Sequence, residues 1–116
     1  MSAVWMMKKL TVGALCTIAM FSASPSGAQQ AAEVQVSYSN GQFQPGEVRA
    51  PADTPITFRV KNLDAKAMEF ESKSLRVEKV VAANSEGVIN VRALKPGRYE
   101  FYDDFNAKAR GVLTVQ

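Results

Sequence analysis

The sequence predicts an all-β domain, an antiparallel Greek-key β-sandwich. Apolar residues alternate with polar ones over short runs, which is the pattern of half-buried strands. Turn signals such as Asn40-Gly41 and Pro96-Gly97 recur at intervals of about 8–12 residues, as they do in sandwiches. No stretch offers three turns of amphipathic helix. Short strands joined by tight turns are therefore expected to build the whole core.

The first 28 residues have the pattern of a secretory signal peptide. Lys8 and Lys9 form a positive start, residues 10–21 are mostly apolar, and small residues at 24–28 provide a cleavage point. The apolar run is shorter than the roughly 20 residues of an ordinary membrane span, so we expect export, with no membrane span after cleavage.

Cleavage would divide the chain into a short tail and one domain. Residues 29–33 are polar or small and are expected to form a flexible N-terminus, and 34–116 to form the domain. Lipid modification of Cys16 would require cleavage directly after Leu15, and such cleavage is expected to follow a small residue instead.

The strands follow in order along this domain. The clearest is 56–61, whose apolar residues share one face. Residues 68–72 fit an edge strand or a loop, and 75–82 fit neither a strand nor a helix period. In the closing strand, either Val112 or Leu113 points inward. The expected segments are 34–38, a short one at Val48, 56–61, 68–72, 75–82, 88–94, 99–102 and 111–115.

A domain of this size supports one thin core between two sheets. About 88 residues bury roughly 60–65% of the surface that the unfolded chain exposes. The segment 94–99 resembles the tyrosine corner of Greek-key sandwiches, in which a Tyr hydroxyl reaches back to the backbone a few residues upstream. The large side chains expected in the core are Phe43, Phe58, Phe70, Tyr99 and Phe101.

The composition excludes several classes of site. The chain has no His, and its one Cys lies in the expected signal peptide. The exported domain therefore cannot build a structural zinc site, an iron–sulfur cluster, a disulfide, a His-based triad or a blue-copper centre. Without the signal peptide, Lys plus Arg falls from 14 to 12 against 11 acidic residues. No basic stripe remains, so no nucleic-acid partner is expected.

Two acidic clusters are the candidate functional residues. On a strand, Glu69 and Glu71 point to one face while the Phe between them points to the other. Asp103 and Asp104 directly follow the strand expected at 99–102. A solvated strand face and a turn in which Asp accepts backbone N–H groups would explain both clusters without a function. Together they indicate a site only if the fold brings them close.

Several segments of the domain carry motifs that are specific in their order and spacing. They are 60–64, 69–72, 75, 78–81, 94–101, 104–105 and 111–113. In these motifs the chain resembles the cupredoxin-like domain of the EfeO type. The resemblance extends over about 34–115 and implies a cupredoxin-like sandwich. It also implies a periplasmic protein that handles iron or copper, helps to oxidise or deliver ferrous iron, and works beside an iron-permease system.

The resemblance also implies a metal site at one end of the sandwich, with copper or iron as the metal. In that fold, the loop after the 56–62 strand and the loop between the last two strands lie at the same end. Many relatives have His where this chain has Asn106, so the donors left are carboxylates and one thioether. Carboxylates suit iron or manganese, whereas a single Met holds Cu(I) poorly. The expected ligands are Met68, Glu69, Glu71, Asp103, Asp104 and Asn106.

Two functions from different classes remain open. The first is metal binding in iron or copper uptake or in electron transfer, with a periplasmic or permease component as partner. The second is a degenerate cupredoxin that binds a protein partner without metal, with Phe105 as an apolar contact. A hydrolase with paired acids would need a sugar-sized cleft, for which a sandwich of this size leaves little room. A non-enzymatic role is therefore favoured.

Overall fold

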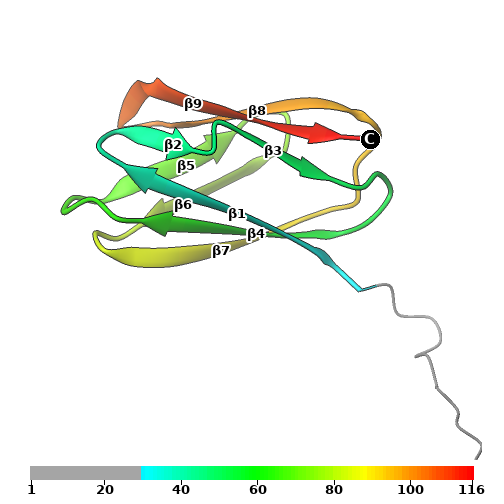
Figure 1. The fold of residues 1–116 in the computed structure, drawn as a ribbon, viewed down its shortest axis with the longest axis horizontal. Helices are drawn as coiled ribbons and strands as arrows, with labels where there is room; N and C mark the ends of the chain where they lie inside the picture. Colours follow the sequence, from blue (N-terminus) through cyan, green and yellow to red (C-terminus); the bar gives the residue numbers. More distant parts are fainter. Residues whose placement is uncertain (1–29) are drawn as a thin grey trace, which may run out of the picture.

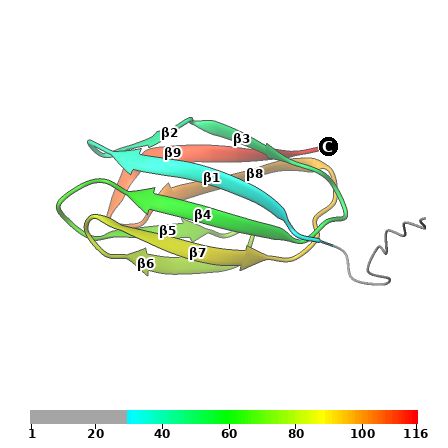
Figure 2. The same ribbon diagram turned by 60° about the horizontal axis from the view of Figure 1, so that its bottom comes forward.

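The protein is a sandwich of two β-sheets (Figures 1 and 2). Its structure is a computed structural model that describes residues 30–116, so the expected signal peptide and Cys16 lie outside the described residues. Among residues 30–116 there is no helix of the length and hydropathy needed to cross a membrane. The strands are β1 (Ala32–Ser39), β2 (Gln42–Gln44), β3 (Glu47–Ala50), β4 (Ile56–Asn62), β5 (Met68–Ser72), β6 (Val77–Val81), β7 (Ser85–Val91), β8 (Gly97–Asp103) and β9 (Asn106–Val115).

One sheet has the strand order β2-β1-β4-β7 and the other has the order β3-β9-β8-β5-β6. The predicted two-sheet sandwich is confirmed, but two pairings, β1–β4 and β3–β9, are parallel. The chain changes sheets between β2 and β3, which places β3 beside the last strand, and β4 runs alongside β1. Alternation within a strand indicates which face is buried and carries no information about the partner strand, so the sequence could not reveal these parallel pairs.

A cluster of aromatic rings fills the centre of the sandwich. The rings of Phe43, Phe58, Phe70 and Phe101 contact one another with centroids 5.0 to 6.2 Å apart. The prediction is wrong for Tyr99, which is only half-buried and packs beside the core. Its hydroxyl donates to the Lys95 carbonyl at 2.6 Å, as expected of a tyrosine corner, and this bond holds the tip of the ring at the surface.

Several element boundaries differ from the predicted ones. β1 begins at Ala32, because the Ala32 amide donates to the Pro55 carbonyl at 2.8 Å and the strand pairs with β4 from this residue onward. Residues 73–76 form a turn in which Arg76 has a φ of 60°. The expected segment 75–82 therefore begins with two turn residues, and the alternation of β6 does not extend over the whole segment. β9 begins at Asn106, five residues earlier than expected, because it pairs with β8 up to the hairpin turn.

Candidate metal-binding site

β5 carries the first acidic cluster on the outer face of the five-stranded sheet. Glu69 and Glu71 are half-buried, whereas Phe70 between them is fully buried. This confirms that the two carboxylates share one face. Met68 has the same parity as Phe70 and is also fully buried, so the structure places its thioether in the core, on the opposite face of the sheet from both carboxylates.

The tight β8–β9 turn brings the second acidic cluster to the first. The Asp104 amide donates to the Glu69 carbonyl at 2.8 Å. As a result, one carboxylate oxygen from each of Glu69, Glu71 and Asp104 lies within 4.8 Å of the other two. We call these three side chains the acidic cluster. Within residues 30–116, no ion pair joins any of them to a Lys or Arg.

Mutual repulsion and burial both act on the acidic cluster. The pKa of Glu69 is raised above its ordinary value, first by burial and then by the charges of Glu78, Asp104 and Glu71. Glu78 was missed in the sequence, because it belongs to the segment whose period was ambiguous. It lies directly opposite Glu71 on β6, on the same face of the sheet. A bound cation would relieve this repulsion.

Asp103 lies beside the acidic cluster and is used differently. Its side chain is 3% exposed, and its Oδ2 accepts a hydrogen bond from the Tyr38 hydroxyl at 2.5 Å. Its Oδ1 accepts from the backbone N–H groups of Glu69 and Phe105, both at 2.9 Å. Asp103 therefore ties β1, β5 and the β8–β9 turn together, and protein donors occupy three of the roughly four lone-pair sites of its carboxylate.

Tyr38 is the partner that sequence reasoning missed. The alternation of β1 indicated that it is buried, but nothing in the pattern of a half-buried strand shows where a hydroxyl finds its acceptor. Burial, followed by the hydrogen bond to Asp103, raises the pKa of Tyr38 to about 12. In the Tyr38–Asp103 pair, the Tyr38 hydroxyl therefore stays protonated and donates its hydrogen bond to the buried Asp103 carboxylate.

Asn106 lies in a different place, in a cavity of about 530 Å³ at the loop end of the sandwich. Tyr38, Lys66 and Phe105 also line this cavity. Asp64 lies there too, and its carboxylate caps the β1–β2 turn by accepting from the Asn40 and Gly41 amides at 2.7 and 3.1 Å. Of the six expected ligands, the structure thus groups Glu69, Glu71 and Asp104 and separates them from Met68, Asp103 and Asn106.

A protein-family model and a curated protein match this chain. A model of the cupredoxin-like domain matches residues 12–115. An uncharacterized protein of Rickettsia prowazekii (strain Madrid E) is 36% identical over 84 residues, which are 72% of this chain and 67% of that protein.

Solved structures of low identity share the fold. The metal binding domain of the Cu(I)-exporting P-type ATPase CopA of Streptococcus pneumoniae D39, with Cu(I), has a TM-score of 0.65 at 14% identity, covering 78% of this chain and 99% of that chain. A copper binding protein in the apo form has a TM-score of 0.64 at 16% identity, covering 72% and 86%. Reduced auracyanin of Roseiflexus castenholzii has a TM-score of 0.60 at 15% identity, covering 77% and 99%. With a family model that matches nearly the whole described domain, this chain belongs to the cupredoxin-like domain family.

Proposed function

We propose that this protein binds a hard metal ion, iron before copper, on the outer face of β5 through Glu69, Glu71 and Asp104. The observation that carries the proposal is the convergence of these three carboxylates, whose oxygens lie within 4.8 Å of one another without a balancing Lys or Arg in the described chain. Carboxylates brought together in this way repel one another, and a cation between them removes that cost.

The donor chemistry favours iron over a blue-copper centre. Such a centre requires two His and one Cys around the copper, and residues 30–116 contain neither type. The solved structures whose names mention copper therefore support the fold of this chain. They do not support a copper ligand set in this chain. Carboxylate oxygens suit hard or borderline ions such as iron and manganese.

We further propose that the protein works in the periplasm as a metal-handling component of an iron uptake system. Two observations support this role, the secretory pattern of residues 1–28 and the resemblance to the EfeO-type domain. Binding and delivery of the ion fit the acidic cluster better than electron transfer, because the cluster offers no thiolate or imidazole to tune a redox couple.

Titration of the purified protein with Fe(II), Mn(II) and Cu(II) at pH 7 tests the metal site. We expect Glu69→Gln and Asp104→Asn to weaken Fe(II) or Mn(II) binding at least about tenfold, the loss typical even of outer-shell partners. Glu33→Gln is the matched control, since Glu33 is also an outward-facing strand Glu but pairs with Arg59 on the other sheet. Equal affinities in all four proteins would contradict the proposal.

A second function has one observation in its favour. Phe105, at the tip of the β8–β9 turn, is 60% exposed, and exposed aromatic side chains are typical anchors of protein interfaces. The domain would then act as a partner-binding module without metal. A pull-down from envelope extract with wild-type protein and Phe105→Ala tests this function. Capture of the same partner by the Phe105→Ala variant would count against it.

A further inference from the structure

A second polar site lies on the same face as the acidic cluster. It is an open hollow of about 560 Å³ between the β5–β6 turn and the outward side chains of β8 and β9. We call it the basic hollow. Its lining residues are Lys73, Ser74, Arg98, Glu100, Tyr102 and Arg110.

The basic hollow has an excess of positive charge. Its three cations face one carboxylate, that of Glu100, which pairs with Arg110 at 3.5 Å. Arg110 also lies over the Tyr102 ring, 5.1 Å from its centroid. Neither Lys73 nor Arg98 makes an ion pair or a side-chain hydrogen bond among the described residues. Two cationic groups therefore remain open to a ligand, whereas the Ser74 hydroxyl is hydrogen-bonded to Ser72 at 3.5 Å and the Tyr102 hydroxyl to Glu71.

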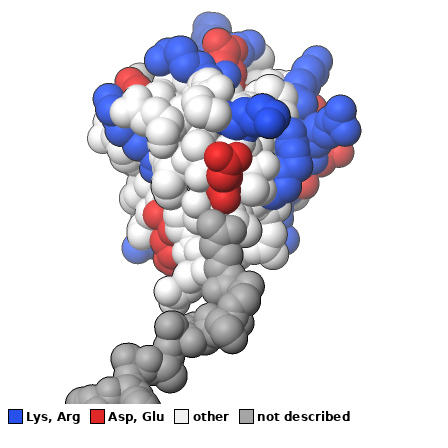
Figure 3. All heavy atoms as spheres, turned by 90° about the vertical axis from the view of Figure 1, so that its right-hand side faces the viewer, with Lys and Arg blue, Asp and Glu red and all other residues white. Residues whose placement is uncertain are grey.

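Longer-range charge acts in the same direction. The β5–β6 turn, residues 73–76, and the β7–β8 connection, residues 92–96, together contain four Lys or Arg and no Asp or Glu, and Arg98 follows at the start of β8. Figure 3 looks at the end of the sandwich where β8 begins, and several Lys and Arg side chains lie there with Asp and Glu side chains among them. The excess of positive charge in these two segments concentrates anions near the basic hollow.

The frame around the basic hollow is held in place without a ligand. Ser72 donates through its hydroxyl to the Glu100 carbonyl at 2.6 Å, which fixes the start of the turn against β8. Arg92 donates to the Leu75 carbonyl at 2.9 Å, which fixes the far side of the same turn. Lys73 and Ser74 are thus carried by a braced turn, so that little backbone ordering is needed to bind a ligand.

We propose that the basic hollow binds a small oxyanion with at least two negative charges, of the phosphate or polycarboxylate class. Planar guanidinium groups match the paired oxygens of carboxylates and phosphates, and an ammonium group adds a further charged donor. An excess of two positive charges fits a dianion better than a monoanion.

The position of Tyr102 links the basic hollow to the acidic cluster. Tyr102 lies opposite Glu71 on one neighbouring strand and opposite Arg110 on the other. A complex of a metal ion with a polycarboxylate would place its cation on the acidic cluster and its free carboxylates on the arginines. This last step rests on the proposed metal site, whereas anion binding by itself does not.

Binding of inorganic phosphate and of citrate to the metal-free protein, measured by calorimetry at about 0.1 M salt, tests the basic hollow. We expect the double variant Lys73→Gln/Arg98→Gln to bind at least about tenfold more weakly, since two charge-assisted contacts are removed. Arg49→Gln is the matched control, because Arg49 is an exposed Arg on β3 of the same sheet and pairs with Glu47 at 3.7 Å. Glu100→Gln removes the internal carboxylate and should tighten binding.

The outcomes separate the two proposals. Absence of saturable binding of either anion, or equal weakening by Arg49→Gln, would overturn the basic hollow as a site. Binding of phosphate alone would assign it to compact oxyanions, and binding of citrate to polycarboxylates. Saturable anion binding by a wild-type protein that binds neither Fe(II) nor Mn(II) would refute the metal site and leave the anion site standing. Citrate binding that metal strengthens in wild type but not in Glu69→Gln would support both.

Discussion

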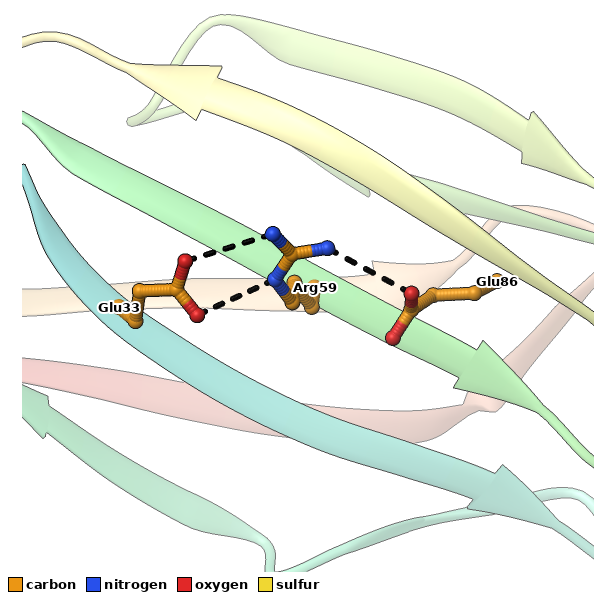
Figure 4. Close-up of polar contacts among 3 residues, drawn as sticks. All are labelled: Glu33, Arg59 and Glu86. Carbon is orange, nitrogen blue, oxygen red and sulfur yellow. Dashed lines mark hydrogen bonds and ion pairs between the residues drawn. The ribbon is translucent and has the colours of Figure 1, made fainter.

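The outer faces of the two sheets differ in whether their acidic residues have a neighbouring cation. On the four-stranded sheet, Arg59 on β4 lies between two carboxylates (Figure 4). Its guanidinium is 3.1 Å from Glu33 on β1 and 3.5 Å from Glu86 on β7. Hydrogen bonding to Glu33 is the main cause of the raised pKa of Arg59. Each Glu on this face has a neighbouring cation.

On the five-stranded sheet, three carboxylates converge, and cations lie apart from them in the basic hollow, on β8, β9 and the β5–β6 turn. Both faces present Glu at outward strand positions, so the strand pattern is the same and only the placement of positive charge differs. An arginine among Glu69, Glu71 and Asp104 would have balanced them, as Arg59 does on the other sheet. The comparison teaches that uncompensated charge distinguishes a candidate site from an ordinary solvated face.

The largest expected effect comes from the residue that holds the acidic cluster together. Asp103→Ala leaves the Tyr38 hydroxyl and the amides of Glu69 and Phe105 without their acceptor. We expect a loss of about 3 kcal/mol or more in the free energy of unfolding, because each unsatisfied buried donor costs about 1–3 kcal/mol. Urea unfolding at pH 7 measures it. A loss under about 1 kcal/mol would show that Asp103 does not have this structural role.

Tyr38→Phe removes one of the three donors and should cost about 1.5–3 kcal/mol, the range for hydrogen bonds to charged groups. The pH dependence sharpens this prediction. Tyr38 titrates at about 12 in the folded protein and near 10 when unfolded, so its stabilising contribution is complete below pH 10 and is lost as the pH rises through 12. Between pH 10 and 12, wild type should therefore lose stability more steeply than Tyr38→Phe. Parallel curves would exclude the Tyr38–Asp103 pair as the cause.

The two outer faces should respond with opposite signs to the same substitution. Glu33→Gln breaks an exposed ion pair with Arg59 and should lower the free energy of unfolding by about 0.2–1 kcal/mol. Glu69→Gln removes a charge from a repulsive cluster and should raise the melting temperature of the metal-free protein. Calorimetric melting at low salt measures both. Destabilisation by both substitutions would remove the distinction between the faces.

The smallest expected effect is the pH dependence of Glu69. Its pKa in the folded protein is raised, so between its ordinary value of 4.5 and the raised value the folded state holds a proton that the unfolded state has lost. Stability therefore falls as the pH rises through this window. The melting temperature of wild type relative to Glu69→Gln should be higher near pH 4.5 than at pH 7. A constant difference would contradict the repulsion.

The sequence was sufficient for the features that alternation and turn chemistry control. It predicted the sandwich, the four core Phe residues and the shared face of Glu69 and Glu71. The parallel pairs, Glu78 beside Glu71 and the Tyr38–Asp103 bond depend on which strands become neighbours. Because that choice is made by tertiary packing, the expected six-residue ligand set mixed residues from the outer face, the core and the loop end.

The central claim is that the acidic cluster is kept unbalanced in order to hold a cation. The most direct test compares the melting temperatures of wild type and Glu69→Gln at pH 7, first without metal and then with Fe(II) or Mn(II). The metal concentration is set at about 100 times the dissociation constant of wild type. A ligand at this level stabilises a folded protein by about 2.7 kcal/mol. The account predicts that Glu69→Gln melts higher without metal and wild type melts higher with it. The same order under both conditions would contradict the claim.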